Sequence, residues 1–367
     1  MSHNISPQEP LLATKLFVPP TRSDVVSRSR LINQLNAQVR RKLTLVSAPA
    51  GFGKTTLLST WCAAAAKNGR CITWVSLDTD DNDPTRFWGY IIAALKTVVA
   101  DIGDNVLALL RFPQPPPVES ALVTLINTLT AFPNDIALIL DDYHLIETQA
   151  IHSALMYLLD HLPQHLHLVI ASRVDPPLPI ARMRAQGHLS EIRMTDLRFT
   201  ADEAAKFLNS IMNLHLSADD VAFLEAKTEG WIAGLHLAAI ALHGRSDVAD
   251  FVSALTGKHR YVLDYLGDEV LKRQPEHIQA FLLQTSILDR LCSSLCDAVT
   301  GWENSEALLE QLEQANLFIV PFDDERRWYR YHHLFAEFLQ TRLQQAHPVG
   351  ARFIAPSIAP SIAPLSV

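Results

Sequence analysis

The stretch LTLVSAPAGFGKTTLLSTW, residues 43–61, decides the fold of the chain. It begins with an apolar run of strand-forming residues, turns at Gly51 and Gly53, and continues into residues that favour a helix. Glycine is the residue that most easily adopts the backbone of such a turn. This order of strand, glycine turn and helix predicts the first unit of a parallel sheet covered by helices.

The turn has the composition of a phosphate-binding loop (P-loop). Its N–H groups can surround phosphate oxygens, the positive end of the following helix faces them, and Lys54 can reach the outer phosphates. Ala48 takes the first position, where glycine is commoner, but alanine is an accepted variant there. We expect nucleotide contacts from the whole loop: Ala48, Pro49, Ala50, Gly51, Phe52, Gly53, Lys54, Thr55 and Thr56.

Two acids follow another apolar run, IALILDD at residues 136–142. An acid at the end of a neighbouring strand commonly helps the P-loop hydroxyl to hold Mg²⁺. We therefore predict that Thr55 and Asp141 hold the metal and that Lys54 and Asp141 serve catalysis. Asp142 comes next at the strand tip, where it could orient or deprotonate a water molecule.

Arg173 ends another apolar run, LHLVIASR at residues 166–173. The next strand of a parallel sheet would deliver this cation toward the γ-phosphate, which makes Arg173 a candidate catalytic sensor. An ordinary surface arginine is the alternative interpretation.

The remainder of the chain predicts three further regions. Apolar runs alternate with amphipathic stretches up to Arg173, and capping signals at Thr200 and Ser217 begin a helical region. Near the end, a strand, a turn, a strand and a helix indicate a winged helix. The predicted fold is thus an α/β P-loop NTPase followed by an all-α domain and a winged-helix domain. The expected boundaries are a lead segment at 1–38, the NTPase at 39–199, the helical domain at 200–286, the winged helix at 287–346, and a disordered low-complexity tail at 347–367.

Composition narrows the function. Hydrophobic residues make up 48% of the 367 residues, so the chain should fold. The net charge is -8, which argues against non-specific binding to nucleic-acid backbones. Its start lacks a signal peptide, and no apolar run reaches the roughly 18 residues of a membrane span. We expect a cytoplasmic protein without a membrane partner. The histidines at 161, 165 and 167 lie in a loop and strand, and we assign no metal beyond Mg²⁺.

Three later motifs carry a family resemblance: HLVIASRVDPPLPIARMRAQGHL at 167–189, TEGWIAGLHLAA at 228–239 and RYHHLF at 330–335. With the P-loop and the paired aspartates, the chain resembles the large ATP-dependent LuxR-type transcriptional activators, the family of the maltose-regulon (MalT-like) activator. That family belongs to the STAND class of signal-transduction ATPases. The likeness runs from about Leu11 to Leu343.

The resemblance implies a nucleotide-controlled switch with weak hydrolysis. The winged helix would close over ADP, and ATP with an inducer would promote an open, self-associating state. Arg28 resembles the residue near the base and sugar, and His332 resembles the histidine that touches the β-phosphate of ADP. A surface arginine, the neighbouring His333, or an aromatic wing packing its own core remain the alternatives. Ile232 stands where many switch ATPases have a nucleotide-contacting proline, which argues against base contacts from that segment.

Family members continue into a helical-repeat sensor domain and a helix-turn-helix, and neither follows here. We therefore expect a truncated relative that does not bind DNA directly and that acts through self-association or through full-length relatives in the ATP state. The alternatives are a P-loop ATPase with steady turnover, and a non-functional or interaction-only fragment.

Overall fold

The computed structural model of the chain describes residues 11–21, 25–99, 102–103, 106, 118–243, 259–323 and 325–346. They fall into two compact units. The first lies within Met1–Ala254 and Ala307–Ile319, and the second within Leu255–Glu306 and Val320–Val367. The predicted tail at 347–367 lies outside the described residues, and the bounds of the five predicted regions remain predictions.

A five-stranded sheet forms the centre of the first unit, in the order β2-β3-β4-β1-β5. Every neighbouring pair is parallel. Parallel strands are covered on both faces, so they become almost wholly apolar, and all residues of β1, β3 and β4 are buried. The strands are β1 (Leu43–Ser47), β2 (Cys71–Ser76), β3 (Ile136–Asp141), β4 (Leu166–Ser172) and β5 (Leu189–Arg193). Strands β1, β3 and β4 confirm the apolar runs predicted as strands, whereas β5 was not predicted as a strand.

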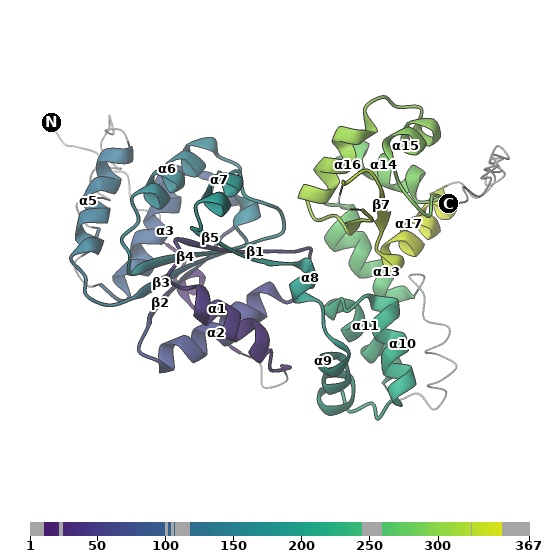
Figure 1. Ribbon diagram of the computed structural model, residues 1–367, viewed down its shortest axis with the longest axis horizontal. Helices are drawn as coiled ribbons and strands as arrows, with labels where there is room; N and C mark the ends of the chain where they lie inside the picture. The colour runs from purple at the N-terminus through teal and green to yellow at the C-terminus, as the bar shows by residue number, and fades with distance from the viewer. Residues whose placement is uncertain are drawn as a thin grey trace, which may run out of the picture. The chain divides into compact units, whose positions relative to one another are not determined.

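Helices cover both faces of this sheet (Figure 1). One face carries α1 (Ser29–Gln38) and α2 (Lys54–Lys67), which contact each other. The other carries α3 (Pro84–Lys96) and α6 (Gln149–Asp160), with α5 (Val118–Thr130) beside α6. Short segments complete the layer: η1 (Ala13–Leu16), η2 (Thr79–Asn82), η3 (Tyr143–Leu145) and α7 (Ile180–Ala185).

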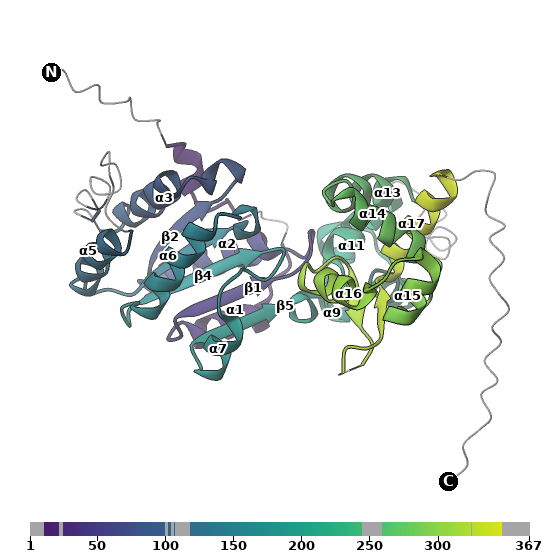
Figure 2. The same ribbon diagram turned by 90° about the horizontal axis from the view of Figure 1, so that it is seen from above.

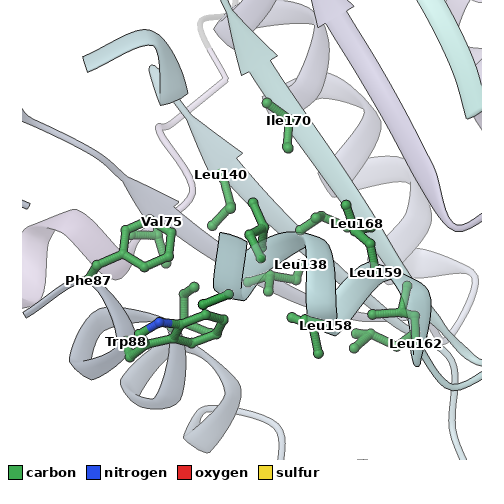
Figure 3. Close-up of a cluster of buried hydrophobic side chains, with 14 of the residues drawn as sticks. Val75, Phe87, Trp88, Leu138, Leu140, Leu158, Leu159, Leu162, Leu168 and Ile170 are labelled. Atoms are coloured by element: carbon green, nitrogen blue, oxygen red, sulfur yellow. The ribbon is translucent and has the colours of Figure 1, made fainter. Parts of the chain in front are cut away.

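The main hydrophobic core lies between the sheet and α3 and α6 (Figure 3). Strand residues such as Leu138 and Ile170 face Trp88 from α3 and Leu158 from α6. All four side chains are at most 1% exposed. Burial of one such side chain stabilises a fold by roughly 1.5–3 kcal/mol. This core holds the strands in the register that brings their carboxyl ends together.

Capping residues begin two of the helices. The Asp83 side chain accepts a bond from the Arg86 N–H at 2.8 Å at the start of α3, with Pro84 in the first turn. Thr200 and Glu203 form a capping box at the start of α9. This capping box confirms the predicted start of the helical region at Thr200.

The helical region continues the first unit with α8 (Met194–Leu197), α9 (Ala201–Ala205), η4 (Lys206–Ile211), α10 (Ala218–Thr228) and α11 (Ile232–Leu242). The second unit contains α13 (Arg260–Leu266), η5 (Gly267–Leu271), α14 (Glu276–Thr285), α15 (Ser293–Thr300), β6 (Ile319–Pro321), β7 (Tyr329–Tyr331) and α17 (His333–Ala346). Helix α16 (Ser305–Gln314) and the residues up to Ile319 run from the second unit into the first.

Within the second unit, α17 packs against α13 and α14, near one another in Figure 2. Strands β6 and β7 pair and precede α17, which confirms the predicted strand, turn, strand and helix. In the described part of the chain, no helix has both the length and the apolarity that crossing a bilayer requires.

His167 is a buried histidine of β4, the strand that pairs with β1, and its burial makes the stability of the fold depend on pH. Its Nδ1 lies 2.6 Å from the Arg41 carbonyl and its Nε2 lies 3.0 Å from the Thr44 hydroxyl. The carbonyl requires the proton on Nδ1, so Nε2 accepts from Thr44. Burial lowers the pKa of His167 from 6.5 to about 4. The folded protein therefore keeps this ring neutral.

Below pH 6.5 the unfolded chain takes up a proton at His167 that the folded chain refuses until about pH 4. We expect His167→Gln to remove a loss of stability of up to about 3 kcal/mol across this interval. Denaturant melts from pH 7.5 to pH 4 measure the difference. His161→Gln, at an exposed position, serves as the control and should follow the wild type. Parallel curves for wild type and His167→Gln would contradict this role.

Candidate functional site

The P-loop joins the end of β1 to the start of α2. Gly51 and Gly53 both have left-handed backbone, with φ of 78° and 74°. A side chain at either position would be strained, so these glycines allow the chain to reverse within a few residues. The first turn of α2 then begins at Lys54, directly after the loop.

Lys54 folds back over the loop. Its Nζ donates to the carbonyls of Ala48 at 2.7 Å and Pro49 at 3.0 Å, and the residue is only 8% exposed. Burial lowers the pKa of Lys54 to about 8, and the charge of Arg173 acts in the same direction. Asp142 and Asp141 act in the opposite direction and offset part of this effect. A buried cation held by carbonyls would gain stability from an anion placed beside it.

Thr55 and Asp141 meet as the sequence predicted for a metal site. The Thr55 hydroxyl donates to Asp141 Oδ2 at 2.8 Å, and the Asp142 N–H donates to Asp141 Oδ1 at 3.1 Å. Asp141 is 3% exposed, and burial, followed by the charge of Asp142, raises its pKa to about 6. Adjacent hydroxyl and carboxylate oxygens are the donors that Mg²⁺ prefers, so these residues fit that ion.

Asp142 lies just beyond β3 in a left-handed conformation, with φ of 57°. Its side chain is 45% exposed, and its Oδ1 lies 3.8 Å from His144 Nδ1. The carboxylate of Asp142 is thus open to solvent, whereas that of Asp141 is enclosed.

Arg173 directly follows β4, the neighbour of β1 in the sheet. Its backbone carbonyl accepts a bond from the Asn316 side-chain amide at 3.0 Å, and the same amide bonds the Ser47 hydroxyl at 3.0 Å. Its charge reaches Lys54 strongly enough to lower the pKa of that residue. The candidate sensor therefore lies at the same edge of the sheet as the P-loop.

A cavity of about 550 Å³ opens beside the P-loop. Its wall combines the lead segment, the P-loop with the first turns of α2, and the helical region. The lining residues include Pro19, Val26, Arg28, Gly51, Gly53, Thr55, Thr56, Phe199, Phe207, Met212, Ile232, Ala233 and His236. Most of these side chains are apolar. Ile232 lies in this wall, although its presence in place of a proline was expected to argue against base contacts from that segment.

Arg28 lines the cavity but is tied to the helical region. Its guanidinium bonds Glu203 at 3.2 Å and the Arg198 carbonyl at 2.9 Å, and it lies over the Phe199 ring at 5.1 Å. It is 7% exposed. Nη1 is buried and has no hydrogen-bond partner among the residues that the structure describes. This donor remains for a ligand, and nucleotide contact by Arg28 stays a prediction.

His332 belongs to the second unit, where it is 1% exposed, whereas His333 is exposed. The adjacent Tyr331 hydroxyl lies 2.7 Å from the Thr285 hydroxyl, and its ring packs against Phe335. The aromatic wing thus contributes to the core of its own unit. The predicted contact of His332 with a phosphate stays a prediction.

Sequence reasoning missed the residues that hold the P-loop from outside. Trp231 Nε1 donates to the Ala50 carbonyl at 3.0 Å, and the Ala233 N–H donates to the Gly51 carbonyl at 3.0 Å. Phe318 packs its ring against Trp231 and Phe52. The motif around Trp231 was visible, but its partner lies 181 residues away, and no local pattern identifies such a pair.

Comparisons with known proteins agree with this arrangement. Residues 267–350 match the family model described as the MalT winged helix domain. The chain is 36% identical over 338 residues to the HTH-type transcriptional regulator MalT of Yersinia enterocolitica, which covers 91% of this chain and 37% of that protein. It is 34% identical over 339 residues to the serine/threonine-protein kinase PknK of Mycobacterium tuberculosis, which covers 92% of this chain and 30% of the kinase.

Among solved structures, the Walker-type ATPase PABY2304 of Pyrococcus abyssi is similar, with a TM-score of 0.59 and 14% identity. The alignment covers 87% of this chain and 97% of that one. At such low identity the likeness supports the fold alone. The fold is therefore that of a P-loop NTPase followed by helical and winged-helix regions.

The chain is thus similar to MalT over 91% of its length, and its residues 267–350 match the MalT winged helix domain. It spans about a third of the length of the two relatives above, at 37% and 30%.

The buried carboxylate of Asp141 predicts an unusual effect of Asp141→Asn on the protein without nucleotide. Because the folded pKa is raised to about 6, the charged form is destabilising above that pH. We expect Asp141→Asn to be more stable than the wild type at pH 8, by about 2 kcal/mol, and the gain to shrink below pH 6. Thermal melts at pH 5 and pH 8 measure it. Asp80→Asn, an exposed control, should change neither.

Proposed function

We propose that the chain binds ADP and ATP with Mg²⁺ and forms the nucleotide-controlled core of a MalT-like regulator. The observation that carries this proposal is that the P-loop, with the buried Lys54 and the Thr55–Asp141 pair, adjoins a largely apolar cavity whose wall includes Gly51, Gly53 and Thr55. Phosphates lie against the loop, and the base lies in the cavity.

Electrostatics supports the phosphate position. Burial lowers the pKa of Lys54, and a phosphate bound beside it would stabilise the charged form of the lysine. The raised pKa of Asp141 is relieved in the same way by a cation. Thr55 and Asp141 would hold that Mg²⁺, which neutralises phosphate charge when it is bound. Burial thus disfavours the charged forms of both Lys54 and Asp141, and MgATP would compensate both charges together.

The cavity supports the base position. At about 550 Å³ it has the size of a small-molecule site, and its apolar wall suits a flat heterocycle. Arg28 supplies an unsatisfied buried donor at the same wall. Fluorescent ADP that enters this cavity should be displaced by unlabelled adenine nucleotides.

Hydrolysis, where it occurs, resets the switch. Water attacks the γ-phosphorus, the bond from that phosphorus to the β–γ bridging oxygen breaks, and Asp142 receives the proton of the attacking water. Lys54 and Arg173 stabilise the charge that develops on the phosphoryl oxygens. Asp142 is 45% exposed, and an exposed base is screened by solvent, which is consistent with slow turnover. ADP and inorganic phosphate are the products.

Regulation by association completes the proposal. MalT is named as a transcriptional regulator with a helix-turn-helix, and this chain matches 37% of it. We infer that the ATP state exposes a surface for self-association or for full-length relatives, and that any effect on transcription passes through such a partner.

The first test concerns Lys54. We expect Lys54→Ala to weaken ADP and ATP binding by about 100-fold, because the lysine contributes a charge-assisted contact to phosphate in an enclosed site. Isothermal titration and fluorescent-ADP displacement measure the affinities. Lys67→Ala, at the exposed end of the same helix, is the matched control and should bind as the wild type does.

Equal binding by wild type and Lys54→Ala, or no binding by the wild type, would contradict the proposal. Steady ATP hydrolysis at many turnovers per second by the wild type would instead favour an ordinary P-loop ATPase. Binding without any change of size between ADP and ATP would favour an interaction-only fragment.

The second test concerns the switch. If His332 contacts the β-phosphate only in the ADP state, His332→Ala should weaken ADP binding by about tenfold and leave ATP binding within about twofold. His333→Ala is the neighbouring control. Equal losses for both nucleotides, or a loss with His333→Ala instead, would reject this role for His332.

A further inference from the structure

Four successive carbonyl groups of the P-loop accept hydrogen bonds. Ala48 and Pro49 accept from Lys54, Ala50 accepts from the Trp231 indole, and Gly51 accepts from the Ala233 N–H. The last two donors come from the start of α11, where Trp231 is the N-cap and Ala233 lies in the first turn, far along the chain from the loop. The loop is thus held from two independent sides.

Because the peptide group is planar, these bonds also fix the direction of the neighbouring N–H groups. In a trans peptide the carbonyl of one residue and the N–H of the next point in opposite directions. Fixing the Ala50 carbonyl therefore fixes the Gly51 N–H, and fixing the Gly51 carbonyl fixes the Phe52 N–H. These are the donors with which a P-loop surrounds phosphate oxygens.

The two sides differ once a phosphate is bound. Lys54 must leave the carbonyls of Ala48 and Pro49 in order to reach a phosphate, so its hold on the loop is lost in the loaded site. Trp231 and Ala233 bond carbonyls that a phosphate does not compete for. Their bonds therefore serve both the empty and the loaded loop.

Trp231 is itself packed to a single position. It is fully buried, and Phe318 meets its ring edge-on at 5.2 Å. Gly234 leaves the space that the indole needs, because a Cβ on Gly234 would lie 2.6 Å from the indole Cε3. The indole N–H is therefore aimed by tertiary packing and not by the loop.

We propose that Trp231 is a positioning residue of the nucleotide site: by holding the Ala50 carbonyl it aims the Gly51 N–H at the phosphates. It acts through the loop and contacts no reacting atom. This inference rests on the proposed nucleotide function, but its structural half, the hold on the loop, can be tested without nucleotide.

The experiment compares Trp231→Phe with Trp88→Phe. Both changes replace a fully buried indole by a benzyl ring in the same unit. Trp231 loses a bond to the loop, whereas Trp88 Nε1 has no hydrogen-bond partner in the described part of the chain, so its change removes no bond. We expect amide hydrogen exchange in a peptide covering residues 48–53 to become about tenfold faster in Trp231→Phe alone. The affinity for ADP should fall about tenfold in the same variant.

Two outcomes overturn the inference: exchange and affinity that match the wild type in Trp231→Phe, or equal changes in Trp88→Phe, which would indicate general loosening of the core. If the wild type does not bind ADP, the proposed function fails, and the exchange comparison alone decides the inference. If Trp231→Phe does not fold, Phe318→Leu takes its place, because it removes the ring edge against Trp231 and keeps the indole N–H. It should shift exchange and affinity in the same direction by a smaller factor.

Discussion

The pairing of β1 on both of its sides is the constraint on which the site depends. Strand β1 is hydrogen-bonded on both sides, by β4 and by β5, so its end cannot move independently of its neighbours. Because all five strands run in parallel, their carboxyl ends meet at one edge. The P-loop leaves β1 there, Arg173 leaves β4, and Asp141 ends β3. The pairing of the strands, held in register by the core, thereby brings together a loop and two residues from distant parts of the sequence.

Lys54 and Asp141 at this edge of the sheet carry charges that burial disfavours. Lys54 and Asp141 are both nearly buried, yet in the described structure the lysine is bonded to carbonyls and the aspartate to a hydroxyl. Burial weakens the charged form of each, which is visible in a lowered pKa for one and a raised pKa for the other. An anion beside Lys54 and a cation beside Asp141 would each offset the cost of burying that charge.

Much of the site could be predicted from the sequence because its chemistry is local. The P-loop is one continuous stretch, and Asp141 is marked by an apolar run that ends in acids. Strand β5 escaped prediction because the short LSEIR, with two charged residues, lies at the sheet edge. The Trp231 contact escaped for another reason: it depends on packing between segments far apart in the chain, and periodicity contains no information about such pairs.

The short segment before β6 has a strained backbone. Asn316 and Phe318 both have left-handed backbone, with φ of 49° and 56°. Asparagine adopts this conformation readily, but for an aromatic residue it costs on the order of 1–2 kcal/mol. The packing of the Phe318 ring against Phe52 and Trp231 holds the backbone of Phe318 in this strained conformation. This backbone cost would be relieved if the segment separated from Phe52 and Trp231. The free energy needed to separate it is therefore smaller than its buried contacts alone suggest.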